Sequence, residues 1–163
     1  MFEVRVQQQP LVPETEQRQL RRQQPGLGAL VSFTGIMRDF SDGNPVSEML
    51  LEHYPGMTDS VLRQLMDQAR TRWPLRTGLI VHRVGRLHPE DPIVLVATGS
   101  MHRTEAFRAC EFLIDALKTQ APLWKRETTQ QGPRWVAARE HDTQAADRWD
   151  TEHRDAENRD QAE

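Results

Sequence analysis

The stretch in the middle of the chain constrains the fold most, because two apolar strands and an amphipathic helix follow one another there with little chain between them. Thr77–Val84 and Pro92–Thr98 are rich in β-branched and apolar residues, and a short loop of His, Pro and Asp joins them, as expected for two neighbouring strands. A helix is predicted from about Arg103 to Lys118, with Pro122 stopping the chain beyond it. The expected buried face of this helix holds Phe107, Cys110, Ile114 and Leu117.

The rest of the chain also alternates between strands and helices. Further strands are predicted at Phe2–Val6, Gly28–Met37, Val46–His53, Leu123–Thr129 and Arg134–Ala138. Helices are predicted at Pro13–Gln24 and from Thr58, as the capping residue, to Arg72. The loop at residues 38–45 is expected to join its two flanking strands as a long hairpin. Because several strands are joined as hairpins, the pattern predicts an α+β fold with mixed or antiparallel sheets, not a doubly wound parallel sheet.

Charge divides the chain into two parts. Residues 1–140 are predicted to form a single domain, and 163 residues suffice for one hydrophobic core. Residues 141–163 hold eight acidic side chains and three arginines, a net charge of −5, which leaves +2 on residues 1–140 out of the total of −3. The acidic tail is compatible with a helix at its start, and its last dozen residues are typical of disorder.

Composition excludes several classes of protein. A nearly neutral body with a single tyrosine does not favour nucleic-acid binding. No apolar run approaches the roughly 20 residues that span a bilayer, and the N-terminus does not resemble a signal peptide. The six histidines are scattered, the single cysteine falls on an apolar helix face, and no glycine-rich phosphate loop is present. We therefore expect a soluble, cytoplasmic protein without a metal or cofactor.

Only two of the 21 basic residues are lysines, Lys118 and Lys125. Lysine can release a proton during catalysis, whereas arginine in effect cannot, so two surviving lysines suggest a chemical role. Lys118 ends the predicted helix and Lys125 begins the next strand, and the turn at Pro122 would direct both toward one pocket. A neighbouring cation favours the neutral amine, although the helix C-terminus favours the charged form of Lys118. The alternative is that both are solvated lysines beside a structural Trp124.

Two further sites have the chemistry of anion binding. His102 and Arg103 lie where a buried strand ends and a helix begins, and free backbone N–H groups at such a junction attract anions. Arg38 follows a buried strand and opens a glycine-containing loop, which suits a clamp for phosphate or carboxylate. For each residue taken alone, a solvated side chain explains the sequence equally well or better.

Taken together, these segments resemble one family, the catalytic subunit of molybdopterin synthase. The resemblance covers roughly residues 28–140 and is carried by GALVSFTGIMRD, LEHYPGMT, HRVGRLHPED, SMHRTEAFRA, DALKTQAPLWKRE and GPRWVAARE, in that order. It implies a hammerhead-type α+β fold and a homodimer within a heterotetramer. It also implies a small ubiquitin-like partner, whose C-terminal Gly-Gly thiocarboxylate gives up sulfur to cyclic pyranopterin monophosphate.

The same resemblance implies roles for individual residues. Lys118 and Lys125 would be catalytic and would also contact the substrate. The other substrate-binding residues would be Ile36, Met37, Arg38, His102, Arg103, Arg126 and Glu127. Arg139 would lie near the tail of the partner.

Three rival interpretations remain open. A non-catalytic docking module for a ubiquitin-like tail would need the arginines but not the lysines. An arginine-rich RNA-binding domain would bind RNA with a steep dependence on salt. A family member that has lost activity would usually have lost at least one of the five residues Arg38, His102, Arg103, Lys118 and Lys125, and all five are present.

Overall fold

The computed structural model describes residues 1–136 and 144–149. Its strands are β1 (Phe2–Gln7), β2 (Ala29–Ile36), β3 (Phe40–Ser41), β4 (Asn44–His53), β5 (Leu75–Arg83), β6 (Gly85–Leu87), β7 (Pro92–Ser100), β8 (Leu123–Thr129) and β9 (Gly132–Val136). Its longer helices are α1 (Pro13–Gln23), α2 (Met57–Arg72) and α3 (Arg103–Gln120). Residues 144–149 add one short helix.

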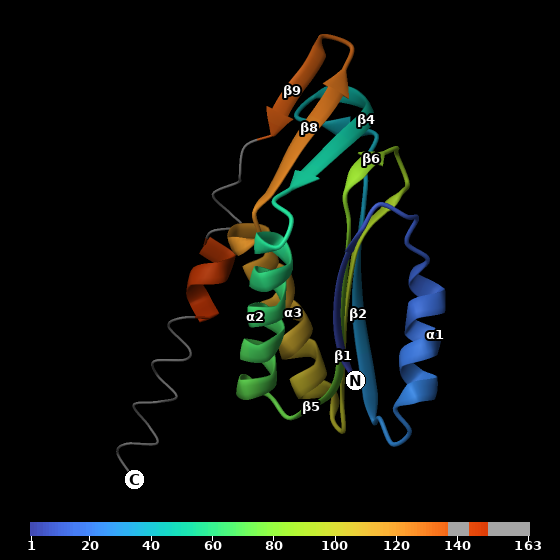
Figure 1. Ribbon diagram of the computed structural model, residues 1–163, viewed down its shortest axis with the longest axis vertical. Coiled ribbons are helices and arrows are strands. Elements are labelled where there is room, and N and C mark those ends of the chain that lie inside the picture. Colours follow the sequence, from blue (N-terminus) through green and yellow to red (C-terminus); the bar gives the residue numbers. More distant parts are fainter. Residues whose placement is uncertain (137–143, 150–163) are drawn as a thin grey trace.

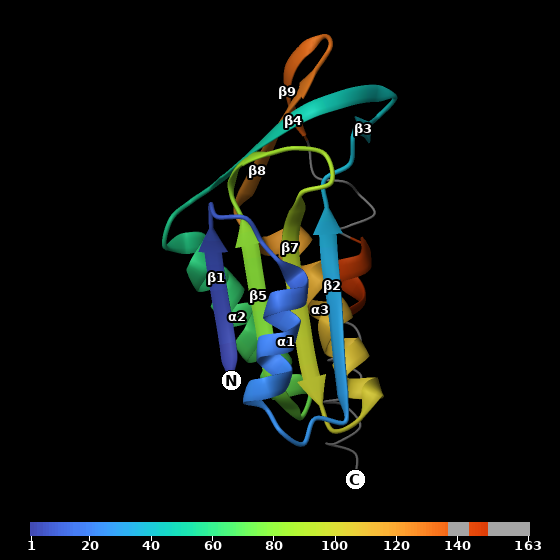
Figure 2. The same ribbon diagram turned by 90° about the vertical axis from the view of Figure 1, so that its right-hand side faces the viewer.

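The strands form two sheets. The first has the order β1-β5-β7-β2, and α1 covers one face while α2 and α3 cover the other (Figures 1 and 2). Within it β1 runs parallel to β5, and the other two pairs are antiparallel. The second sheet forms one end of the molecule, with the order β3-β4-β8-β9 and with β6 also paired to β4 (Figure 1). The predicted α+β class with mixed and antiparallel sheets is confirmed.

The main core lies between the first sheet and the helix pair α2 and α3. Apolar residues recur every three or four positions along both helices, so each helix turns one apolar stripe toward the sheet. The fully buried members include Leu62 and Leu65 of α2, Leu113 of α3 and Ile80 of β5. A second apolar cluster surrounds Leu20 of α1, and a third forms the core of the second sheet.

The predicted hairpin formed by residues 28–37 and 46–53 is wrong. β2 pairs with β7 in the first sheet, with Leu30 opposite Gly99, whereas β4 pairs with β8 and β6 in the second sheet. The chain therefore passes from one sheet to the other after Ile36. The composition of a strand predicts that it is buried, but not which strand lies beside it.

Two predictions about helix residues are also wrong. Phe107 is 60% exposed, and Ala106, Phe112 and Leu113 form the buried face of α3 with the correctly predicted Cys110. Thr58 does not cap α2, because the helix begins at Met57. Thr58 is instead fully buried: its hydroxyl accepts a hydrogen bond from the backbone N–H of Tyr54 at 3.2 Å and donates one to the Pro122 carbonyl at 3.1 Å.

The part of the chain predicted as an acidic tail is described only at residues 144–149. This short helix packs Trp149 against Trp73 and Phe112, with ring centroids 5.7 Å from each. The last dozen residues, for which we predicted disorder, lie outside the described residues.

Candidate functional site

The two lysines lie on either side of one turn that joins the first sheet's helix layer to the second sheet. Lys118 is in the last turn of α3 and Lys125 is the third residue of β8, and both side chains are exposed. Two backbone hydrogen bonds shape the turn, from Ala121 N–H to Leu117 O at 3.2 Å and from Leu123 N–H to Ala121 O at 2.8 Å. The hydroxyl of Thr58 ties the same turn to the start of α2.

Strand pairing determines which face of the second sheet Lys125 occupies. Its partners across the sheet are Leu51 on β4 and Val136 on β9. Directly paired residues share one face of a sheet, and Leu51 is buried in the core of the second sheet. Lys125 therefore projects on the inner face, from which the core residues also extend. Arg126, the next residue, lies on the outer face, where its guanidinium is 5.7 Å from the ring centroid of Trp135.

Glu127 returns to the inner face but has an ionic partner of its own. Its carboxylate is 12% exposed and accepts from Arg134 at 3.0 Å. Arg134 also donates to the backbone and hydroxyl oxygens of Ser41, at 3.1 and 3.2 Å. The guanidinium of Arg134 thus joins β9 to β8 and β3, and the charge of Glu127 is balanced within the second sheet.

A buried histidine lies within electrostatic range of Lys125. His82 near the end of β5 is 3% exposed, and its Nδ1 is 2.8 Å from the carbonyl oxygen of Arg83. Because a carbonyl only accepts, Nδ1 carries the proton in this contact. Burial lowers the pKa of His82 to about 4; the hydrogen bond to Arg83 opposes this shift, and the charges of Lys125 and His53 add to it. The imidazole is therefore neutral at physiological pH.

His82 was not among the residues predicted for this site. The sequence shows that His82 lies near the end of an apolar strand. It does not show that His82 lies close to Lys125 in space, because the two residues are far apart along the chain. The crossing from β5 into β6, which pairs with β4 beside β8, creates that relation.

Arg38 extends from a backbone that is held in place at the end of β2. The preceding residue, Met37, is buried, and its N–H donates to Asp91 O while its carbonyl accepts from Glu90 N–H, both at 2.9 Å. The carboxylate of Asp91 in turn lies 3.3 Å from the nearly buried guanidinium of Arg83. Arg38 itself is exposed, as is Ile36. The C-terminal ends of β2 and α3 point the same way, so Arg38 and Lys118 belong to the same end of the first sheet (Figure 2).

His102 and Arg103 lie at the other end of α3. His102 is the residue before the helix and Arg103 its first residue, and both are exposed. At a rise of 1.5 Å per residue, Arg103 and Lys118 are separated by about 22 Å along the helix axis. A single chain therefore does not bring the His102–Arg103 pair to the lysines. Arg139, predicted near the partner's tail, lies outside the described residues.

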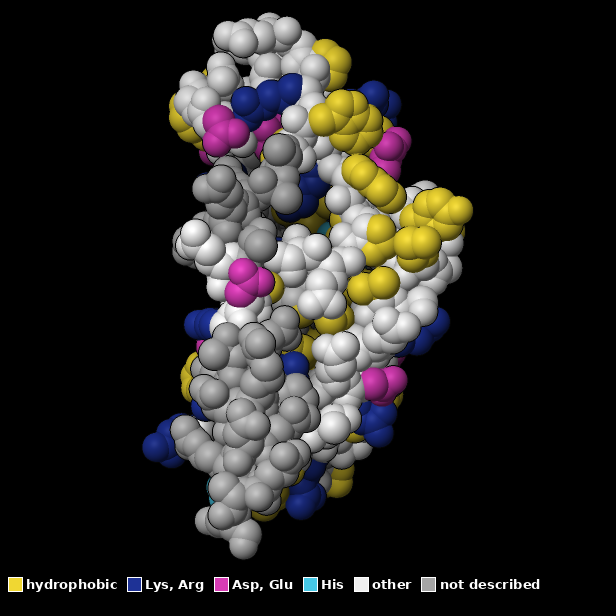
Figure 3. All heavy atoms as spheres, turned by 90° about the vertical axis from the view of Figure 1, so that its left-hand side faces the viewer, with side chains coloured by type: hydrophobic (Ala, Val, Ile, Leu, Met, Phe, Trp, Pro, Cys, Tyr) yellow, Lys and Arg dark blue, Asp and Glu magenta, His cyan; other side chains and the backbone are white. Residues whose placement is uncertain are grey.

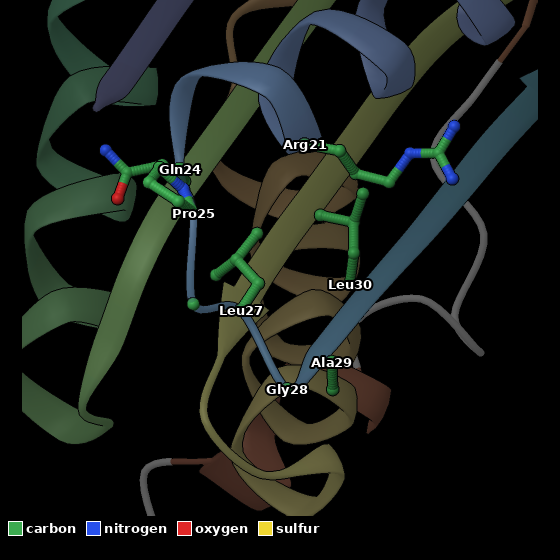
Figure 4. A pocket seen from close by; sticks show the side chains of 8 residues that line it. Arg21, Gln24, Pro25, Leu27, Gly28, Ala29 and Leu30 are labelled. Carbon is green, nitrogen blue, oxygen red and sulfur yellow. The ribbon is translucent and has the colours of Figure 1, made fainter.

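One hollow in the surface lies away from the lysines, between α1 and β2, and has a volume of about 360 Å³ (Figure 4). Its lining residues come from the end of α1, the connecting turn and the start of β2: Arg21, Gln24, Pro25, Gly26, Leu27, Gly28, Ala29 and Leu30. Arg21 is the only charged side chain among them. None of the predicted site residues contributes to this hollow.

Within residues 1–136 and 144–149, no group of three or more His, Cys, Asp or Glu side chains is placed to hold a metal ion. The same residues contain no helix that is both long and apolar enough to cross a bilayer.

Comparison with known proteins gives consistent results across the chain. The model of the family described as MoaE protein matches residues 6–120. The molybdopterin synthase catalytic subunit of Ralstonia nicotianae is 53% identical over 146 residues, covering 90% of this chain and 83% of the relative. That of Pseudomonas aeruginosa is 51% identical over 147 residues, covering 90% and 98%.

Solved structures agree. The molybdopterin biosynthesis MoaE protein of Burkholderia ambifaria is 48% identical and superposes with a TM-score of 0.78, covering 91% of this chain and 98% of that protein. This chain therefore belongs to the MoaE protein family.

Proposed function

We propose that this protein is the catalytic subunit of molybdopterin synthase, a sulfur-transfer enzyme of molybdenum cofactor biosynthesis. It adds two sulfur atoms to cyclic pyranopterin monophosphate, each taken from the C-terminal thiocarboxylate of a small ubiquitin-like subunit. The observation that carries the proposal is that the chain's only two lysines flank one turn, which is held by a hydrogen bond from the buried side chain of Thr58. Relatives of nearly full length with this name support it.

The lysine turn suits the chemistry of this reaction. Opening a cyclic phosphate and attacking with a thiocarboxylate both require proton transfer and stabilisation of negative charge. An exposed pair of amines provides a proton carrier and a positive charge at one place. The neutral imidazole of His82 adds no further positive charge behind Lys125.

Arg38 is proposed to hold the phosphate of the pterin. A guanidinium binds two oxygens of a phosphate at once. Its side chain is exposed, but its backbone is held by the two hydrogen bonds between Met37 and the loop at residues 90–91. The fixed backbone limits how far the bound phosphate can move relative to Lys118. Ile36 and Met37 would contact the pterin from the same segment.

We infer that His102 and Arg103 act across a homodimer. They are about 22 Å from Lys118 of their own chain, so they reach a lysine turn only if a second copy presents them. β2 is an edge strand of the first sheet, and its side chains Phe33 and Ile36 are exposed, as is Phe107 on α3. An edge strand with exposed apolar side chains is a ready surface for association.

The small subunit is proposed to bind beside the second sheet, one copy at each end of the dimer. Exposed apolar side chains surround the outer face of this sheet and the start of α2: Tyr54, Met57, Trp124 and Trp135. Figure 3 shows hydrophobic side chains gathered at this edge of the molecule. Trp124 is adjacent to Lys125, so a partner bound here would have its tail close to the catalytic turn. Arg139 would contact that tail, and the complex would work in the cytoplasm.

Mass spectrometry of the pterin product tests this function. The purified protein is incubated with the cyclic precursor and the thiocarboxylated small subunit, in parallel with Lys118→Ala. We expect a pterin with two added sulfurs from the wild type and little or none from the variant. A stable complex with the small subunit but no sulfur transfer by the wild type would leave a non-catalytic docking module as the better interpretation.

A further inference from the structure

A buried ion pair lies next to the segment that carries Arg38. Arg83, the last residue of β5, is 6% exposed, and its Nη1 lies 3.3 Å from Oδ2 of Asp91 and 3.5 Å from the carbonyl oxygen of Pro92. Within the described part of the chain, its Nε is buried and has no hydrogen-bond partner. Removing a guanidinium from water costs free energy that one ion pair offsets only in part. A geometric role therefore explains this pair better than a contribution to stability.

Asp91 closes the turn that joins β6 to β7. Its Oδ2 also accepts from the backbone N–H of His88 at 3.0 Å, and its own N–H donates to the His88 carbonyl at 3.0 Å. Between these two residues, Glu90 adopts a φ of 72°, in the left-handed region that residues other than glycine rarely occupy. Such a backbone persists only where its surroundings hold it. The carboxylate of Asp91 holds it here, because it binds His88 within the turn and Arg83 outside it.

The same turn receives the end of β2. The regular pairing of β2 with β7 is interrupted near the last residue of β2, and beyond that point the turn supplies the partners. The Met37 N–H donates to the carbonyl of Asp91, and the Met37 carbonyl accepts from the N–H of Glu90, both at 2.9 Å. Figure 2 shows the connection from β6 to β7 passing the C-terminal end of β2. The turn therefore fixes the backbone at Met37, and Arg38 is the next residue.

The chain is also held on the other side of Arg38. The carbonyl of Asp39 accepts from the N–H of Val46 at 2.8 Å. Met37 is 4% exposed and packs in the core of the second sheet. The exposed side chain of Arg38 thus extends from a backbone that is fixed on both sides.

We propose that Arg83 and Asp91 are positioning residues for Arg38: their ion pair holds the turn at residues 88–91, and the turn holds the backbone from which Arg38 reaches the phosphate of the substrate. Both residues act through the backbone, without a contact to the substrate. This inference rests on the proposed function for the role of Arg38. It assigns a task to the segment HRVGRLHPED, which contains none of the predicted site residues.

Binding of the cyclic precursor tests the proposal without turnover. Isothermal titration calorimetry gives the Kd of cyclic pyranopterin monophosphate for the wild type, Arg83→Met, Arg38→Ala and the double variant. Methionine removes the charge and leaves Asp91, whose side chain is 34% exposed, in contact with water. The backbone carbonyl that pairs with His82 is retained. We expect Arg83→Met to raise Kd about five-fold when Arg38 is present and by less than about two-fold when it is alanine, as for residues coupled in one network.

Two variants separate this role from a general loss of structure. Arg83→Lys keeps a charge that can reach one carboxylate oxygen, which is all that the present contact uses, so Kd should stay within about two-fold of the wild-type value. Arg86→Met makes the same substitution three residues further on, at an exposed ion pair with Glu48, and should leave Kd unchanged. If Arg83→Met does not fold, Asp91→Asn takes its place in the cycle. It keeps an oxygen acceptor but loses the charge, so a smaller rise in Kd is expected.

Hydrogen exchange at Met37 tests the hold on the backbone itself. The Met37 N–H is paired with the Asp91 carbonyl, so Arg83→Met should speed its exchange by about ten-fold through local opening. Amides in the regular part of β2 should keep their wild-type rates.

Equal effects of Arg83→Met with and without the Arg38 side chain, or unchanged exchange at Met37, would overturn the positioning role and leave the proposed function standing. A wild type that binds no cyclic precursor would refute the proposed function, and the phosphate-binding role of Arg38 with it. The exchange measurement needs no ligand, so it distinguishes the two failures.

Discussion

Replacing Thr58 with valine should destabilise the protein by more than the change in size suggests. The two side chains have nearly the same shape, and Thr58 is fully buried. Valine would leave the N–H of Tyr54 and the carbonyl of Pro122 without the hydroxyl that now pairs with them. A fully buried polar group left unpaired costs about 1–3 kcal/mol, and both of these hydrogen bonds are only partly buried, so we expect a loss of roughly 2 kcal/mol in the free energy of unfolding.

The assay is urea unfolding followed by circular dichroism, with Thr58→Ser as the matched control. Serine keeps the hydroxyl and loses one methyl group, which is worth about 1 kcal/mol. Because Pro122 lies in the turn between the lysines, Thr58→Val should also reduce turnover of the fraction that remains folded. Equal stabilities of the valine and serine variants would refute the claim that this hydroxyl holds the lysine turn.

Three other substitutions test separate parts of the account. Lys118→Arg keeps the charge but not the ability to exchange a proton, so steady-state turnover should fall by about 100-fold or more; near-normal turnover would leave only an electrostatic role. The pKa of His82 is about 4 in the folded protein, below its ordinary value of 6.5, so stability should be full above pH 6.5 and fall by about 3 kcal/mol toward pH 4. His82→Gln should lack that loss in acid unfolding curves, and an identical pH dependence would contradict the assignment. Arg134→Ala leaves the nearly buried carboxylate of Glu127 unpaired and should lower stability in thermal melts by about 1–3 kcal/mol, whereas Arg86→Ala, at an exposed pair with Glu48, should have little effect.

Local patterns predicted the elements of this fold well. The strand that became β7 and the helix that became α3 follow from apolar runs and their spacing, and Pro122 ends the helix region as expected. Which strands pair with one another was harder to predict, because β2 and β4 are similar in composition but lie in different sheets. Phe107 shows the same limit at a single position: periodicity placed it on the apolar face of α3, yet the small residue Ala106 occupies the contact with the sheet.

The candidate site was predictable where it depends on neighbours in sequence. Lys118 and Lys125 flank a turn that the sequence itself indicates. His82 was not predictable, since its relation to Lys125 arises from the crossing of β5 into the second sheet. The separation of about 22 Å between His102–Arg103 and Lys118 was not predicted either. Both segments carry side chains suited to bind an anionic substrate, but they lie at opposite ends of α3.

The most direct test of sulfur transfer by this protein follows the sulfur itself. The small subunit is charged with a thiocarboxylate made from a heavy sulfur isotope and is given, with the cyclic precursor, to the wild-type protein and to Lys118→Ala. We predict a wild-type product that contains two heavy sulfur atoms, with two small-subunit thiocarboxylates consumed for each product, and almost no labelled product from the variant. A product without heavy sulfur, or equal labelling by the variant, would contradict it.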